Sequence, residues 1–270
     1  MAAPSSHIEA TLNYVDELPP EKPAFYVRQR VPTDRRKGPV MGPHEVAIHD
    51  ARGLATTLDE EGVALVEHEH EFEDFNDPEA VRATYLPEVE ALVRRHTGAR
   101  RVLAFDHNLR STALARAGLH DAQMPVRFAH NDYTDTSAPQ RVRDLLPDEA
   151  ESLLTRRFAV INVWRPVRTL VESDPLAVCD ARTLPEDHMI AMDLIYPDRV
   201  GEVQYVLYEA GHRWLYFPRM EPHEVMLLKC FDSARDGRAR FTAHSAFEDP
   251  TTPAGAPARE SVEVRTLAFF

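Results

Sequence analysis

Basic residues are in short supply in this sequence. The 270 residues include 31 Lys and Arg against 44 Asp and Glu, which gives a formal net charge of −13. A chain with such an excess of negative charge repels polyanions and anionic surfaces. We therefore expect neither nucleic acid nor a membrane as a partner, although the acidity by itself names no substrate.

Cysteine is also rare, and long apolar runs are missing. Cys179 and Cys230 are the only cysteines, and each lies in an apolar, strand-like run. Buried free thiols suit this context better than a disulfide or a catalytic pair. No apolar run approaches the roughly 18 residues that cross a bilayer. The first residues, Met1 to His7, lack the basic and apolar stretches of a secretory signal. These absences predict a cytoplasmic protein.

The second half of the sequence has the pattern of a β-rich fold. Hydrophobic residues make up 43% of the chain, which is enough for a packed core. After Arg157, short segments rich in β-branched and aromatic residues alternate with Pro and Gly. This pattern predicts a sandwich or jelly roll with flanking helices. We expect a single domain over residues 1–270, with residues 1–40 wrapping over it.

Two helices are expected outside the strands. Asp77 followed by Pro78 is a typical helix start, apolar residues then recur at helical spacing, and Gly98 is a plausible stop. Pro87 falls inside this stretch and predicts a kink or a break. A second helix is expected from Leu145 to Arg156.

Three residues stand out as candidate metal ligands. His130 and Asp132 are two positions apart, so on a strand their side chains point to the same face. We expect them at the end of a strand over 126–129, and His244 at the end of another over 239–243. Two imidazoles and one carboxylate on one side of a metal form the arrangement that suits non-haem Fe(II).

The His-x-Asp spacing is not specific by itself. A chain with 13 His and 44 acidic residues holds roughly two such pairs by chance, and the second one here is His7-Ile8-Glu9. Other acidic and histidine residues, such as the run 67–71, His212 and His223, fit solvated or rim positions better. Asp106-His107 either faces the site from behind the ligands or lies in the core or at the rim.

A second group of polar residues follows the last candidate ligand. Arg259 comes fifteen residues after His244, where an iron oxygenase would hold the far carboxylate of 2-oxoglutarate. Ser261 and Arg265 share its parity on the expected final strand, so they face the same side. Arg259 is the better carboxylate ligand because it is nearer to His244, and Arg265 is expected in an ion pair with Glu263 or another carboxylate.

The segment Asn162-Val163-Trp164-Arg165 supplies further candidates. Asn162 and Trp164 share one face of a strand, from which Asn162 would bond a cosubstrate carboxylate or a metal ligand. Trp164 either lines the pocket or packs in the core. Arg165 lies on the other face, where it either contacts a carboxylate of the cosubstrate or forms a structural ion pair, for instance with Asp180.

Ordered sequence blocks resemble one known family. The blocks are HNDYT at 130–134, NVWRP at 162–166, PLAVCD at 175–180, HRWLYFP at 212–218, LKCFDS at 228–233, HSAFEDP at 244–250 and ARESVEVR at 258–265. As a set they resemble the gibberellin desaturase and cephem 7-methoxylase-like family of 2-oxoglutarate- and Fe(II)-dependent dioxygenases. The similarity runs from about Ala104 to the C-terminus.

The resemblance implies a double-stranded β-helix, or jelly-roll, core and an oxidative reaction. Fe(II) would be held by His130, Asp132 and His244, and 2-oxoglutarate would be decarboxylated to succinate and carbon dioxide. A C–H bond of a small organic, natural-product or amino-acid-derived substrate would be hydroxylated or desaturated. A zinc hydrolase built on the same ligands and a non-catalytic β-barrel binding protein remain alternatives. The sequence does not identify the substrate.

Overall fold

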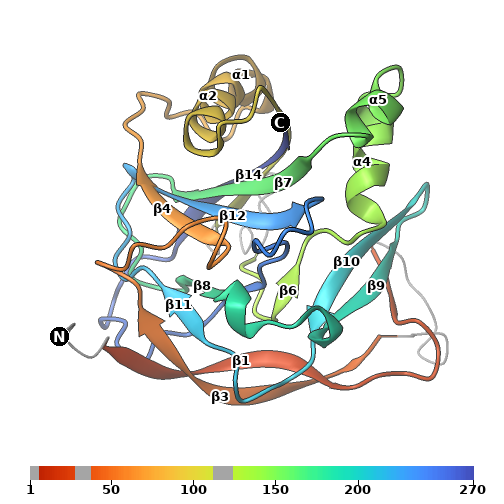
Figure 1. Ribbon diagram of the computed structural model, residues 1–270. Coiled ribbons are helices and arrows are strands. Elements are labelled where there is room, and N and C mark those ends of the chain that lie inside the picture. Colours follow the sequence, from red (N-terminus) through yellow and green to blue (C-terminus); the bar gives the residue numbers. More distant parts are fainter. Residues whose placement is uncertain (1–5, 28–37, 112–123) are drawn as a thin grey trace.

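Two β-sheets packed face to face form the body of the protein (Figure 1). The computed structural model describes residues 6–27, 38–111 and 124–270. Its strands are β1 His7–Glu17, β2 Ala24–Tyr26, β3 Val40–Asp50, β4 Val63–Glu67, β5 Arg101–Ser111, β6 His130–Asn131, β7 Phe158–Pro166, β8 Leu176–Cys179, β9 Met189–Ile195, β10 Val200–Val206, β11 Trp214–Tyr216, β12 Glu224–Asp232, β13 His244–Ala246 and β14 Glu260–Phe269. Its helices are α1 Pro78–Ala80, the π-helix η2 Val81–Tyr85, α2 Leu86–Thr97, α4 Ser137–Leu145, α5 Ala150–Leu154 and the 3₁₀ turns η3 Ala181–Thr183 and η4 Glu186–His188.

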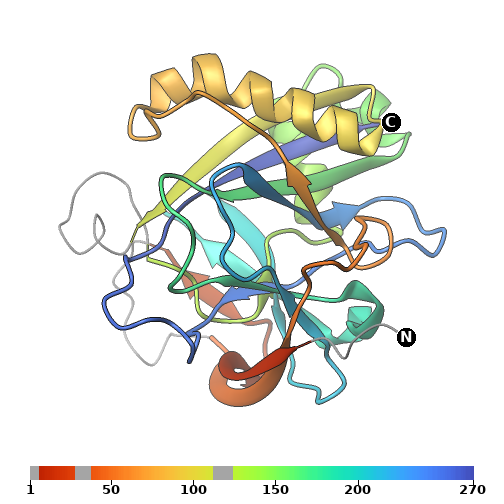
Figure 2. The same ribbon diagram turned by 90° about the vertical axis from the view of Figure 1, so that its left-hand side faces the viewer.

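The larger sheet has the strand order β1-β3-β11-β8-β13-β6-β10-β9-β2, and the smaller sheet has the order β4-β12-β7-β14-β5. Helix α2 lies across the outer face of the smaller sheet, as the turned view shows (Figure 2). The layers are therefore a helix, a five-stranded sheet and a nine-stranded sheet. The prediction of a mainly β, jelly-roll fold with flanking helices is confirmed.

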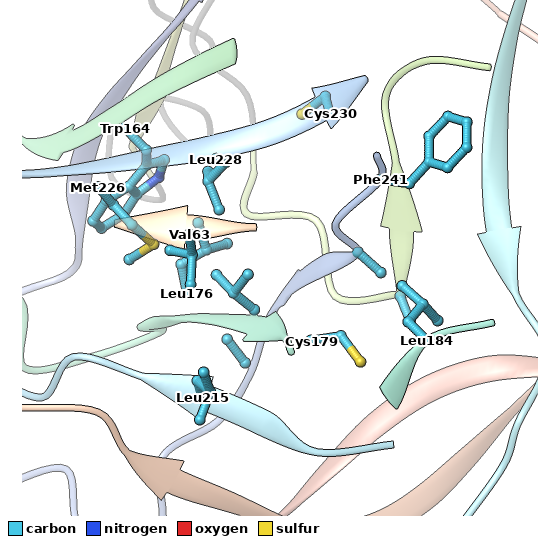
Figure 3. Packing of buried hydrophobic residues seen from close by; sticks show 14 of the residues in the cluster. Val63, Trp164, Leu176, Cys179, Leu184, Leu215, Met226, Leu228, Cys230 and Phe241 are labelled. Carbon is cyan, nitrogen blue, oxygen red and sulfur yellow. The ribbon is translucent and has the colours of Figure 1, made fainter. Parts of the chain in front are cut away.

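The main hydrophobic core fills the space between the two sheets (Figure 3). Trp164 and Met226 from the small sheet lie opposite Leu176 and Leu215 from the large one. Cys179 and Cys230 are both buried and free, and they belong to strands of different sheets. This confirms the expectation of buried free thiols. A second apolar cluster lies under helix α2 on the other side of the small sheet.

The helix after residue 77 begins and ends as the sequence predicts. The Asp77 side chain accepts hydrogen bonds from the backbone amides of Glu79 and Ala80, and Gly98 ends the helix in a left-handed conformation with φ 72°. Pro87 lies in the first turn of α2 and is preceded by the π-helical turn η2. The wider turn accommodates a residue without a backbone N–H, so the helix continues instead of breaking.

The N-terminal segment, which was expected to wrap over the domain, supplies the strands β1 and β2 of the large sheet; residues 28–37 lie outside the described residues. One other expectation about local structure needs correction. The single helix expected over 145–156 is replaced by α4 and α5. Pro147, which cannot donate a helical hydrogen bond, lies between the two. In the described part of the chain, no helix is long and apolar enough to cross a membrane.

Candidate metal centre

The three candidate ligands converge at the middle of the large sheet. Strand β6 lies between β13 and β10, and His130 pairs directly with His244 across the β6–β13 ladder. One ligand atom from each of His130, Asp132 and His244 lies within 4.8 Å of the others, and the two imidazole centroids are 4.4 Å apart. Within the described residues this is the only group of three or more His, Cys, Asp or Glu side chains with such spacing.

The strand context of these ligands differs from the prediction. Residues 126–129 form only an isolated bridge between Phe128 and Asn13, and residues 239–243 are not a strand. The backbone of 239–243 bonds outside a regular ladder, for example from Ala239 to the carbonyl of Asp59. Both histidines therefore begin short strands, and Asp132 lies just after the end of β6.

The two imidazoles are prepared to act as neutral ligands. His130 Nδ1 lies 2.8 Å from the carbonyl oxygen of Phe128, which leaves Nε2 to face the site. Burial, reinforced by the neighbouring His244, lowers the pKa of His130 to about 4. Burial also lowers the pKa of His244. Both rings are therefore neutral near pH 7, and a neutral imidazole nitrogen is what a metal ion binds.

Asp132 is held as an ionised carboxylate. Its Oδ2 accepts hydrogen bonds from Asn162 Nδ2 at 2.7 Å and from Arg265 Nε at 3.0 Å. Burial alone would raise the pKa of Asp132, but Arg265, the two histidines and the Asn162 amide together hold it below its usual range. Its Oδ1 is 3.9 Å from His130 Nε2 and faces the other ligands. Two neutral imidazoles and one carboxylate are the donor set of a facial iron site.

The contact between Arg265 and a metal ligand was not foreseen from the sequence. Arg265 forms the expected ion pair with Glu263, at 3.4 Å, and a second one with Asp106, at 2.9 Å. Its Nε, however, bonds Asp132 itself. Asp106 thus reaches the metal centre through Arg265, which agrees with the alternative that placed it behind the ligands. The missing signal was the strand register, which sets Arg265 opposite Asn162.

A narrow cavity connects the metal ligands to the second group of polar residues. It is lined by His130, His244, Trp164, Arg259 and Glu263, among others. Arg259 is 3% exposed, its guanidinium donates to the backbone oxygen of Asp174, and its Nε has no hydrogen-bond partner. The guanidinium carbon lies 5.5 Å from the ring centre of Trp164, which lines the cavity as expected.

Several buried polar groups of this cavity and of the adjoining strand β14 lack a hydrogen-bond partner. Burial lowers the pKa of Arg259 to about 10, so its guanidinium is still charged near pH 7. Ser261 Oγ is buried and has no hydrogen-bond partner. Burial, together with the nearby Asp132 charge, raises the pKa of Glu263. Buried polar atoms without partners are costly, and they indicate a site that an additional ligand completes.

Arg165 does not join this site, which corrects the prediction made for it. Its guanidinium donates to the backbone oxygens of His68 and Pro222, on the opposite face of β7 from Asn162. The proposed ion pair with Asp180 is absent, because Asp180 bonds Arg182 and Arg213. Arg165 therefore anchors loops at the small sheet, and the cosubstrate carboxylate is left to other residues.

Two larger cavities open next to Arg265, and one of them reaches the metal ligand Asp132. One has a volume of about 550 Å³ and is lined by Asp132, Tyr133 and Arg265, among others. The other has a volume of about 720 Å³ and includes Arg110 from β5. The two share Asp106, Tyr196, Arg199 and Arg265. Both volumes are within the usual range of small-molecule sites.

Comparisons with known proteins agree with this geometry. The family described as YDMC, Oxidoreductase/YMDC permease-like domain, matches residues 12–269. The chain is 36% identical over 232 residues to the alpha-ketoglutarate-dependent dioxygenase phiK of a fungal species, covering 83% of each chain. It is 31% identical over 293 residues to the hydroxylase/desaturase efuI of Hormonema carpetanum, covering 100% of this chain and 97% of efuI.

A solved structure gives the same result for the fold. The iron and alpha-ketoglutarate-dependent endoperoxidase NvfI superimposes with a TM-score of 0.89 at 30% identity, covering 97% of this chain and 98% of that one. Neither a zinc hydrolase nor a non-catalytic barrel is favoured by these similarities. The chain belongs to the Fe(II)- and 2-oxoglutarate-dependent dioxygenases, in the group that contains these fungal hydroxylase/desaturases.

Proposed function

We propose that His130, Asp132 and His244 hold Fe(II), and that Arg259 and Ser261 bind the far carboxylate of 2-oxoglutarate. The observation that carries this assignment is the narrow cavity in which two metal ligands and the buried Arg259 line the same space. A dicarboxylate anchored at the metal through one end would reach Arg259 with the other. The planar guanidinium can pair with both oxygens of a carboxylate.

The residues fit this cosubstrate chemically, although the cavity must open to admit it. Its volume is about 10 Å³, which is room for roughly one water molecule. Arg259 donates to a backbone oxygen that a carboxylate would replace as a stronger acceptor. Ser261 Oγ would gain its first hydrogen bond. Cosubstrate binding would thus satisfy polar atoms that the free protein leaves without partners.

The remaining residues orient the metal ligands and shape the site. When bound, the metal together with 2-oxoglutarate and oxygen would supply the oxidant that attacks a C–H bond of the substrate. Asn162 and Arg265 both donate to Asp132 Oδ2, which keeps the carboxylate ionised and fixes its orientation toward the metal site. Trp164, Leu176 and Ala246 give the narrow cavity an apolar wall that limits access of water.

We infer that the substrate is a small organic molecule of natural-product or amino-acid-derived type, which is hydroxylated or desaturated. It would occupy the two larger cavities, because Arg265 borders both of them and Asp132 borders the one of about 550 Å³. The cavity of about 720 Å³ has a mostly polar lining that includes Asp106, Arg110 and Tyr196, which favours an oxygen-rich substrate over a pure hydrocarbon. The names of the relatives, which include hydroxylase/desaturases, support this inference.

Three finer assignments complete the proposal. We infer that within its family the chain groups with the gibberellin desaturase and cephem 7-methoxylase-like enzymes, an inference that the sequence blocks from 130 to 265 support. It acts as one oxygenase domain in which both sheets contribute to the site. A cytoplasmic location is supported by the two free, buried cysteines.

The test is anaerobically prepared protein supplied with 2-oxoglutarate, oxygen and one metal at a time. We expect succinate to form with Fe(II) and not with Zn(II), at a slow rate even before the substrate is known. Asp132→Ala serves as the control for metal-catalysed background. Succinate formation equal in the Asp132→Ala variant, or hydrolytic activity with Zn(II) alone, would reject the proposal.

A further inference from the structure

We propose that Asn131, the residue between His130 and Asp132, is a positioning residue that locks the metal-binding turn against both sheets. The proposal rests on the metal centre described above but concerns a side chain that faces away from it. Successive side chains of a strand point to opposite faces, so Asn131 lies behind the two ligands. Its side chain is fully buried.

The Asn131 amide is surrounded by acceptors. Its Nδ2 donates to the backbone oxygen of Tyr133 at 2.7 Å, to Gln204 Oε1 at 2.8 Å and to the backbone oxygen of Cys230 at 3.0 Å. Two of these acceptors are backbone carbonyls, which cannot donate, so the NH₂ group and not the amide oxygen must face them. Its two N–H groups serve these three oxygens, whereas Asn131 Oδ1 is buried and has no hydrogen-bond partner.

The three acceptors belong to different parts of the fold. Gln204 is the direct neighbour of Asn131 across the β6–β10 ladder of the large sheet. Cys230 belongs to β12 of the small sheet, where the register with β7 shifts between Lys229 and Phe231. Cys230 is the extra residue at this bulge, which explains why its carbonyl is available to a side chain. Asn131 therefore joins the two sheets directly behind the metal centre.

This tie adds to the anchoring of a turn that follows a very short strand. Strand β6 has only two residues, and Asp132 already lies beyond it. Arg265 and Asn162 hold the Asp132 carboxylate from the side of the small sheet. The bond from Asn131 to the Tyr133 carbonyl closes the turn around Asp132 from the other side. Together these contacts fix the 3.9 Å separation of His130 Nε2 and Asp132 Oδ1.

The experiment measures metal binding directly, without turnover. Full-length protein and its Asn131→Ala and Gln204→Ala variants are titrated with Co(II), which reports the ligand geometry through its visible absorption bands. We expect Asn131→Ala to weaken Co(II) binding, by up to roughly the 10- to 100-fold that follows the loss of groups supporting metal ligands, and to alter the bands. Gln204→Ala removes only one of the three acceptors and should have a smaller effect in the same direction.

A matched control separates positioning from general loss of stability. Tyr14→Phe deletes another buried hydrogen bond, between Tyr14 and Trp214 on β1 and β11, which involves none of the metal ligands. It should lower the melting temperature without changing Co(II) affinity or the bands. Rescue is tested with Asn131→Gln, which keeps the amide but is too long, and it should restore stability better than metal affinity.

The outcomes distinguish this inference from the proposed function. If the unaltered protein binds no Co(II), the metal centre itself is rejected and the role of Asn131 with it. If it binds Co(II) and a folded Asn131→Ala variant does so with the same affinity and bands, only the positioning role is rejected. Should Asn131→Ala fail to fold, unchanged Co(II) binding by Gln204→Ala and Asn131→Gln would overturn the inference.

Discussion

The two faces of the small sheet differ sharply, and β14 shows both in alternate residues. Val262 and Val264 point into the apolar cluster under helix α2. Ser261, Glu263 and Arg265 point the other way, toward the large sheet, and Glu263 and Arg265 each line a cavity beside the metal ligands. From Ser261 to Arg265 the strand therefore carries site residues at odd positions and scaffold residues at even ones.

This comparison teaches how the fold separates stability from chemistry. On the outer face lies the apolar cluster under helix α2, and the burial of apolar surface contributes about 25 cal/mol per Å². On the inner face, charges are buried and paired with one another or with the groups that hold the metal. Substitutions on the outer face should change the free energy of unfolding, whereas those on the inner face should change the binding of metal or cosubstrate.

The largest effect is expected at the ligands themselves. His130→Ala, Asp132→Ala and His244→Ala should each abolish Fe(II)-dependent succinate formation, because two ligands do not hold a labile metal in an open site. Circular dichroism should show a folded protein for each. Turnover retained by any one of the three would remove that residue from the triad.

A charge buried on the outer face should destabilise the protein without selectively affecting metal binding. Val89 of α2 is 1% exposed and packs in the cluster under the helix. Val89→Asp should lower the free energy of unfolding by about 3–5 kcal/mol, since the carboxylate would be buried without a partner. Ala91→Asp, on the exposed side of the same helix, is the control and should be nearly neutral. Normal stability with selectively lost metal binding would contradict the scaffold role.

Substitution of Arg259, the proposed cosubstrate arginine, should weaken the binding of 2-oxoglutarate but not that of the metal. Arg259→Ala should raise the 2-oxoglutarate requirement by roughly 10- to 150-fold, from the loss of a charge-assisted bond of about 1.5–3 kcal/mol. Metal affinity should change little, because Arg259 bonds no metal ligand. Arg259→Lys keeps the charge but loses the planar guanidinium. Its 2-oxoglutarate requirement should therefore lie between those of the unaltered protein and of Arg259→Ala.

The second arginine of the strand should behave in the opposite way. Arg265→Ala removes the bond to Asp132 Oδ2 and leaves Glu263 and Asp106 without their ion-pair partner. We expect Co(II) affinity to fall by roughly 10- to 100-fold while the 2-oxoglutarate requirement of metal-saturated protein stays close to normal. An exchange of these two phenotypes between Arg259 and Arg265 would show that the two roles were assigned the wrong way round.

The sequence predicted the parts of this site that depend on local chemistry. His130 and Asp132 were recognisable because a two-residue spacing places both side chains on one face, whatever the exact strand limits. Arg259 and Ser261 were proposed from their parity and their distance to His244, and their role in binding the cosubstrate stays a prediction. Alternation alone also separated Asn162 from Arg165, but it could not say which face was the site and which was the scaffold.

The parts that escaped prediction depend on contacts between distant segments. Arg265 meets Asp132 because β14 pairs with β7 in a register that sets it opposite Asn162, and no local pattern fixes that register. The hydrogen bond from Asn131 to the Cys230 carbonyl depends on the bulge in β12, a strand of the other sheet. The helix after Asp77 was located correctly, but its π-helical turn reflects packing around Tyr85 as well as Pro87.

The smallest effect, and the sharpest test of the inner face, is expected at Ser261. Its hydroxyl is buried without a partner in the free protein, so Ser261→Ala removes a polar group that is costly to bury. The variant should be as stable as the unaltered protein or slightly more stable. In contrast, it should raise the 2-oxoglutarate requirement by roughly 2- to 12-fold, because the bound carboxylate loses a hydrogen bond of about 0.5–1.5 kcal/mol. Ser233→Ala is the matched control, since that hydroxyl already accepts from the Phe158 amide at 2.9 Å. It should lower the melting temperature and leave 2-oxoglutarate binding unchanged. If a Ser261→Ala variant loses stability but binds 2-oxoglutarate normally, the Ser261 hydroxyl belongs to the scaffold. The site residues of β14 would then begin at Glu263.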